Sequence, residues 1–199
     1  MKARSRAEAV RRGENVRERT TGIRLALLTS MCKALLQLRN GKSYENRAII
    51  LCLYYAIGRG GEVSVLNFDN LRWDVDDDYL WTGWNEFKTG HSSEISYHPS
   101  ATSYAVDILH ALACYIVTAG GKLSDNKHPD EPTWLFPNMA DLADGGPAAK
   151  TSRIISSLIG SVDGLGVEHT SHGLRVGSSD DLAMNELIDI VALIALGGW

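Results

Sequence analysis

The chain has 199 residues, 44% of them hydrophobic and 22% charged, with a formal net charge of −4 at pH 7. These values are typical of a globular protein with one core. The longest apolar run, residues 48–57, is too short to span a bilayer, and the polar N-terminus excludes a secretory signal, so we expect an intracellular protein without a membrane segment.

Charge is unevenly distributed along the chain. Residues 1–25 carry eight Lys or Arg and three Glu, a net +5, whereas the rest carries 12 Lys or Arg and 21 Asp or Glu, a net −9. We predict a basic arm over residues 1–20 and one domain over residues 21–199. The arm is compatible with contacts to phosphate groups, or with a solvated helix that has no partner.

Two helices are predicted after the arm. Residues 21–38 place apolar side chains at helical spacing, and Asn40-Gly41 is expected to end this helix. Residues 44–57 form a second, more apolar helix that stops at Gly58.

Residues 63–68 are predicted to be a short helix, and residues 69–98 a small antiparallel sheet. Aromatic and β-branched side chains alternate along residues 79–81 and 95–97, with a hairpin turn expected near residues 88–91.

Helices are predicted again in the second half of the chain. They cover residues 100–119, 148–162, 172–185 and 186–196, and "WLFP" at 134–137 is expected to be a short buried segment. The fold class is therefore mainly α with a small antiparallel β-sheet (α+β). The three cysteines lie far apart in apolar helical contexts and are expected to be buried free thiols.

A few polar residues are candidates for chemistry. Arg59 and Glu62 are spaced so that the carboxylate can orient the guanidinium, or so that the two form only a surface ion pair. Lys88, near the predicted hairpin turn, can deliver an ammonium group into a groove, or be an ordinary turn residue. His172 and Arg175 share the first turn of a helix if Ser171 caps it. Together with the helix N-terminus they suit a phosphate, with a loop histidine and a surface arginine as the alternative.

The order of these motifs resembles the catalytic domain of the tyrosine recombinases, or phage-type integrases. The resemblance covers roughly residues 21–199. The segments that carry it are "YAIGRGGEVSVLNFDNL", "FKTG", "WLFP", "HTSHGLRVGSSDDLA" and "ALGGW".

The resemblance implies a role for each matched residue. Arg59 and Arg175 would clamp the scissile phosphate and stabilise its transition state, and Glu62 would hold Arg59. Lys88 would protonate the leaving 5′-oxygen and His172 would assist proton transfer. Trp199, at the position where the family carries His or Trp, would buttress the phosphate. The reaction uses no metal or other cofactor, because a 3′-phosphotyrosine link conserves the phosphodiester energy.

The expected function is therefore site-specific DNA recombination or integration on double-stranded DNA, with self-association on DNA in the full-length protein. The location implied is intracellular and DNA-associated. All seven tyrosines precede Arg175, so the family's nucleophile position is not filled. We expect a recombinase fragment that is inactive alone. The alternatives are a non-catalytic DNA-binding module and a helical interaction domain without a nucleic-acid role.

Overall fold

A computed structural model describes residues 20–85, 92–100, 103–123, 133–140 and 145–185. Within these residues the protein is mainly helical, with one three-stranded antiparallel sheet. The expected α+β class is confirmed at this level. The apolar side chains form one hydrophobic cluster that draws on the helices and on one face of the sheet.

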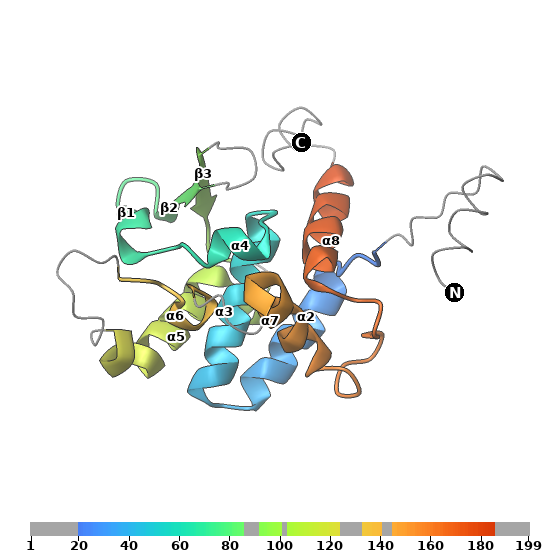
Figure 1. The fold of residues 1–199 in the computed structure, drawn as a ribbon. Helices are drawn as coiled ribbons and strands as arrows, with labels where there is room; N and C mark the ends of the chain where they lie inside the picture. Colours follow the sequence, from blue (N-terminus) through green and yellow to red (C-terminus); the bar gives the residue numbers. More distant parts are fainter. Residues whose placement is uncertain (1–19, 86–91, 101–102, 124–132, 141–144, 186–199) are drawn as a thin grey trace.

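Helix α3 (Gly41–Tyr55) is the centre of the fold. It contacts α2 (Leu25–Gln37), α5 (Ile108–Leu123), α7 (Gly146–Ser156) and α8 (Ser171–Ala183). Figure 1 shows the sheet on one side of these helices and α8 on the other. Residues 48–53 are all at most 1% exposed, which explains the apolar run in the sequence.

The connection between α2 and α3 is shorter than predicted. Asn40 does not end the first helix region but caps the second: its side chain accepts a hydrogen bond from the Ser43 N–H at 2.9 Å, and Ser43 Oγ accepts one from the Asn40 N–H at 3.3 Å. This reciprocal capping box starts α3 three residues earlier than its hydrophobic pattern indicates.

The end of α3 also differs from the prediction. The helix stops at Tyr55, and Ile57 rather than Gly58 adopts a left-handed backbone conformation, with φ +50°. The Gly58 N–H closes the turn on the Leu53 carbonyl at 2.9 Å. A β-branched residue is strained at positive φ, so packing of the 1%-exposed Ile57 side chain must offset that cost.

A short helix, α4 (Gly60–Val63), follows this turn, so the helix predicted at residues 63–68 is wrong. A 3₁₀ turn (Phe68–Asn70) then leads into β1 (Leu71–Asp74), β2 (Tyr79–Asn85) and β3 (Ser92–Tyr97), in the order β1-β2-β3. The predicted alternation is confirmed on β3, where Ile95 and Tyr97 are buried.

The helix predicted from residue 100 starts eight residues later, because Arg47 fastens the preceding segment to α3 in a non-helical shape. Its fully buried guanidinium donates to the carbonyls of Ala105 (2.8 Å) and Tyr104, and contacts His110 Nδ1 at 3.1 Å. After α5, the predicted "WLFP" segment has Leu135 and Phe136 fully buried and leads into α6 (Pro137–Ala140).

Helix α8 packs tightly on the extended segment before α2. A Cβ at Gly177 would lie 2.0 Å from the Ile23 carbonyl oxygen, and one at Gly173 would lie 2.7 Å from that of Thr21. The Ile23 N–H donates to the Gly173 carbonyl at 2.8 Å. Glycine is therefore required at both positions for this close backbone approach.

The remaining predictions have mixed outcomes. Helices α7 and α8 confirm the helices predicted at 148–162 and 172–185, with shifted ends. The helix predicted at 186–196 and the arm up to residue 19 lie outside the described residues. Cys32 and Cys52 are buried free thiols, and burial raises the pKa of each to about 12, but Cys114 is only half-buried. No helix in the described part of the chain is long and apolar enough to cross a membrane.

Candidate functional site

Arg59 and Glu62 form the first half of the candidate site. The Arg59 N–H donates to Glu62 Oε2 at 2.6 Å, and Arg59 Nη1 lies 3.0 Å from Glu62 Oε1. The Glu62 side chain is 3% exposed and that of Arg59 is 29% exposed. The buried carboxylate therefore holds a guanidinium that still reaches the surface, as the R-x-x-E spacing predicts.

The two glycines between them have different roles. A Cβ at Gly60 would lie 2.9 Å from the backbone N and Cα of Ala148, so α4 packs directly against the first turn of α7. Nothing lies within 4 Å of the corresponding position at Gly61. The first glycine therefore fixes where Arg59 sits on the protein, and the second is not required by packing.

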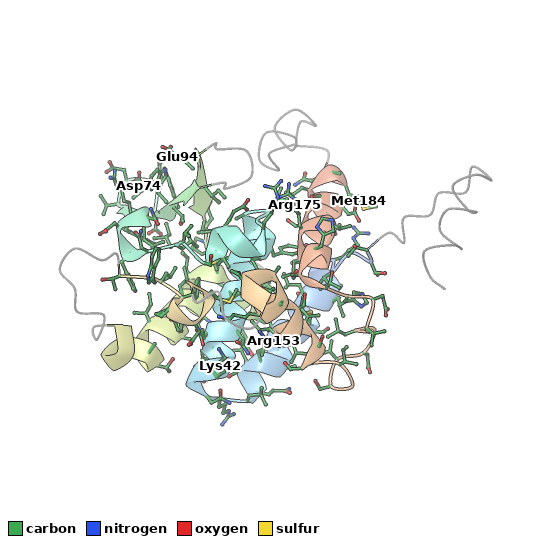
Figure 2. All side chains as sticks on the ribbon, viewed as in Figure 1. Lys42, Asp74, Glu94, Arg153, Arg175 and Met184 are labelled. Atoms are coloured by element: carbon green, nitrogen blue, oxygen red, sulfur yellow. The ribbon has the colours of Figure 1, made fainter. Side chains whose placement is uncertain are left out.

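Arg175 forms the second half of the site. It lies in α8, is 5% exposed, and its Nη1 donates to the Ile57 carbonyl at 2.5 Å. Ile57 is two residues before Arg59, so Arg175 is bound to the turn that leads into Arg59, 116 positions earlier in the sequence. Figure 2 shows Arg175 on the side of α8 that faces α4.

Two effects favour a guanidinium at this turn. The carbonyl oxygens at the C-terminus of α3 carry partial negative charge, which attracts a cation. The left-handed conformation of Ile57 also turns its carbonyl out of the α3 hydrogen-bond pattern. A purely structural role for Arg175, as a cap on α3, rests on the same contact.

His172 lies on the first turn of α8, one turn before Arg175, as predicted, but it is exposed whereas Arg175 is buried. The expected cap is wrong by one residue: Thr170 is the N-cap, without a side-chain hydrogen bond to the helix, and Ser171 is the first helical residue. The Ser171 N–H donates to Ser152 Oγ at 3.2 Å, which ties this end of α8 to α7.

The other two predicted site residues, Lys88 and Trp199, lie outside the described residues. The structure therefore pairs Arg59 with Glu62, binds Arg175 to the backbone carbonyl two residues before Arg59, and places His172 on the same helix as Arg175. Chemically, this turn offers the partly exposed guanidinium of Arg59, and the buried Arg175 is bound to the backbone two residues before it, one helical turn from the N-terminus of α8. It suits an oxyanion such as a phosphodiester.

Asp181 is a polar residue to which the sequence motifs assign no role. Its carboxylate accepts hydrogen bonds from the Tyr54 hydroxyl on α3, from the Leu25 N–H at 2.6 Å, and from Arg24 Nε at 2.7 Å. Burial alone would raise the pKa of Asp181, but these three donors together lower it below its ordinary value. The available sequence signal was "SSDDLA", which does not distinguish this aspartate from Asp180.

Among the residues that the structure describes, no group of three or more His, Cys, Asp or Glu side chains is placed to hold a metal ion. No family model matches this chain, and no curated protein matches it. The geometry of the described residues is therefore the basis for assigning a function.

Proposed function

We propose that this protein binds the backbone of duplex DNA at the Arg59–Arg175 turn, as part of a site for DNA strand cleavage and rejoining of the tyrosine-recombinase type. The observation that carries the proposal is the contact between Arg175 Nη1 and the Ile57 carbonyl, which puts the second arginine beside the turn that begins the R-G-G-E motif.

The arrangement around Arg59 supports a grip on phosphate. Glu62 is engaged by both the backbone and the side chain of Arg59, so the direction of the guanidinium is fixed before a ligand arrives. A preorganised donor loses less side-chain entropy when it binds. The third hypothesis from the sequence, a helical interaction domain without a nucleic-acid role, accounts for Arg175 as a cap on α3 but gives no role to the partly exposed guanidinium of Arg59.

The basic N-terminal segment adds to the proposal. Its net charge of +5 over residues 1–25 contrasts with −9 over the rest of the chain. The described end of that segment, residues 21–25, is bound to α8, the helix that carries Arg175. A polyanion bound at the arginine turn would therefore contact α8, the same helix to which residues 21–25 of the basic segment are bound.

The test is the affinity for duplex DNA measured by fluorescence anisotropy at several salt concentrations. Arg59→Gln should weaken binding about tenfold or more and make the salt dependence shallower by roughly one phosphate contact. Arg39→Gln is the matched control, because it removes one exposed positive charge beyond the other end of α3. Equal losses in the two variants would contradict the proposal.

A second candidate function is DNA binding without cleavage. It needs only the Arg59–Glu62 pair and Arg175, because binding of a backbone phosphate requires no nucleophile. A duplex with a nick beside the scissile phosphate traps a covalent intermediate if a nucleophile attacks. We expect no covalent adduct from this polypeptide on a denaturing gel. An adduct would show that another residue acts as the nucleophile and would contradict this expectation.

A further inference from the structure

The connection between β1 and β2 carries a concentrated negative charge. Four of its five residues are aspartates, Asp74, Asp76, Asp77 and Asp78. Asp74 Oδ1 accepts hydrogen bonds from the Asp76 N–H at 3.0 Å and the Asp77 N–H at 3.1 Å, which holds the turn closed. Among the described residues, no Lys or Arg forms an ion pair with these four carboxylates. The acidic hairpin, which consists of β1, β2 and this turn, therefore presents carboxylates that can bind an added cation.

An exposed indole ring lies next to these carboxylates. Trp73 is 50% exposed on β1, which is an edge strand of the sheet. Its neighbours Leu71 and Leu80 pack against the hydrophobic cluster, but Trp73 does not belong to it. A guanidinium stacks on aromatic rings and pairs with carboxylates, so an indole beside carboxylates suits arginine better than lysine.

The same hairpin already binds one arginine in this way. The guanidinium of Arg72 lies over the Trp81 ring, 5.4 Å from its centroid. Trp81 Nε1 donates to Glu94 Oε2 at 3.3 Å, so an arginine, an indole and a carboxylate lie together on the sheet. Trp73 and the neighbouring aspartates offer the same indole and carboxylate groups, and no arginine of the described residues is stacked on Trp73.

The N-terminal segment, residues 1–19, has the complementary composition. It contains six arginines and one lysine against three glutamates, a net charge of +4. Its only apolar side chains larger than alanine are one methionine and two valines, so charge and arginine stacking are the interactions that it offers. The charge and arginine content of this segment therefore match those of the acidic hairpin.

The position of the described chain start favours the hairpin of a second copy. Residues 21–25 are bound to α8, and Figure 1 shows the sheet on the other side of the helices. A domain of this size is about 40 Å across. The chain from Arg11 to residue 20 spans at most about 30 Å, even when fully extended. Four of the six arginines, Arg11, Arg12, Arg17 and Arg19, therefore do not reach the hairpin of their own chain.

We propose that the N-terminal segment of one copy binds the acidic hairpin of a second copy. Arginines of the segment pair with the carboxylates of the turn and stack on Trp73. Cations also relieve the repulsion among four carboxylates held close together. Two copies that exchange their segments about a two-fold axis form a closed dimer. The contact uses neither Arg59 nor Arg175, so it is independent of the proposed phosphate site.

Sedimentation velocity of the full chain over a range of protein and salt concentrations tests the proposal. At low salt we expect a monomer–dimer equilibrium, which shifts toward monomer as salt screens the exposed charges. Asp76→Asn with Asp77→Asn should weaken dimerisation about tenfold, because a reciprocal dimer loses four exposed ion pairs. Asparagine is favoured in turns, so the hairpin should keep its shape. The matched control is Asp163→Asn with Asp180→Asn, which removes two exposed carboxylates outside the sheet and should leave the dimer unchanged.

A synthetic peptide identifies the occupant of the hairpin. The peptide of residues 1–19 should dissociate the dimer, whereas the same peptide with its six arginines replaced by glutamine should not. Trp73→Ala should weaken dimerisation, and Arg59→Gln should leave it unchanged. Thermal melting of each variant confirms that it is folded.

Four results would overturn the proposal. The first is a monomer at every protein and salt concentration, and the second is an equal loss of dimer in the two double variants. The third is equal dissociation by the two peptides. The fourth is loss of the dimer in Arg59→Gln, which would place the contact at the arginine turn instead.

Discussion

Asp181 joins three parts of the fold through a single carboxylate. It binds the Tyr54 hydroxyl, the Leu25 N–H and the Arg24 guanidinium, so it fastens α8 to α3 and to the start of α2. Because its side chain is 22% exposed, these bonds are only partly screened by water. Its contribution to stability depends on its negative charge.

Replacing this charge with a neutral amide should destabilise the protein. Asp181→Asn keeps the shape but weakens three hydrogen bonds, and we expect the free energy of unfolding to fall by about 1–2 kcal/mol at pH 7. Urea denaturation followed by circular dichroism measures the difference. Asp180→Asn is the matched control, because Asp180 is the exposed neighbour on the same helix, and it should change stability little.

The effect should also depend on pH in a defined direction. The pKa of Asp181 is lowered in the folded protein, so the stabilisation is complete above the ordinary aspartate pKa of about 3.9 and is lost as the pH falls through the lowered value. The wild-type and Asp181→Asn proteins should therefore converge in stability in acid. A difference that stays the same from pH 7 to pH 3 would contradict this role.

Individual residues also differ in how far their role in the candidate site could be predicted from the sequence. The Arg59–Glu62 pair follows from spacing alone, because residues three apart meet across a helical turn. The partner of Arg175 could not be predicted, because it is a backbone carbonyl 118 residues away that depends on the unusual conformation of Ile57. The exposure of His172 likewise depends on how α8 packs.

Among the helices, α8 approaches a neighbouring backbone through two glycines, Gly173 and Gly177. Its backbone approaches the extended segment at Ile23 so closely that no side chain fits between them at Gly177. This contact explains why the described segment before α2 lies against α8. It also holds in place the helix that carries His172 and Arg175.

A methyl group at residue 177 should therefore push α8 away from the extended segment at Ile23. Gly177→Ala would place Cβ 2.0 Å from the Ile23 carbonyl oxygen, and we expect the free energy of unfolding to fall by about 2–3 kcal/mol. Gly61→Ala is the matched control: it meets nothing within 4 Å and should be neutral or stabilise by up to about 1 kcal/mol. Thermal denaturation of both variants makes the comparison, and equal stability would refute the packing argument.

Helix existence was more predictable than helix ends. The apolar periodicity of α2 and α3 is strong, and both helices are present. The sequence predicts too early a start for α5 because Pro99-Ser100 is a plausible local start signal. The decisive interaction is the distant Arg47 side chain, which is bound to the carbonyls of Tyr104 and Ala105. Local sequence patterns contain no information about such a tertiary contact.

For the molecule as a whole, two regions differ in charge. The C-terminal end of α3 meets the arginine turn, and the acidic hairpin lies on the other side of the helices from α8. The overall charge of −4 does not by itself indicate a DNA-binding protein. The proposal that this protein binds DNA rests instead on the positions of Arg59 and Arg175. Net charge can neither support nor exclude it.

A structure of this protein bound to duplex DNA is the most direct test of that claim. We predict one backbone phosphate within hydrogen-bonding distance of both the Arg59 and Arg175 guanidinium groups, with Glu62 still bound to Arg59. DNA bound elsewhere on the protein, or a phosphate contacted by Arg59 while Arg175 remains only a cap on α3, would contradict it.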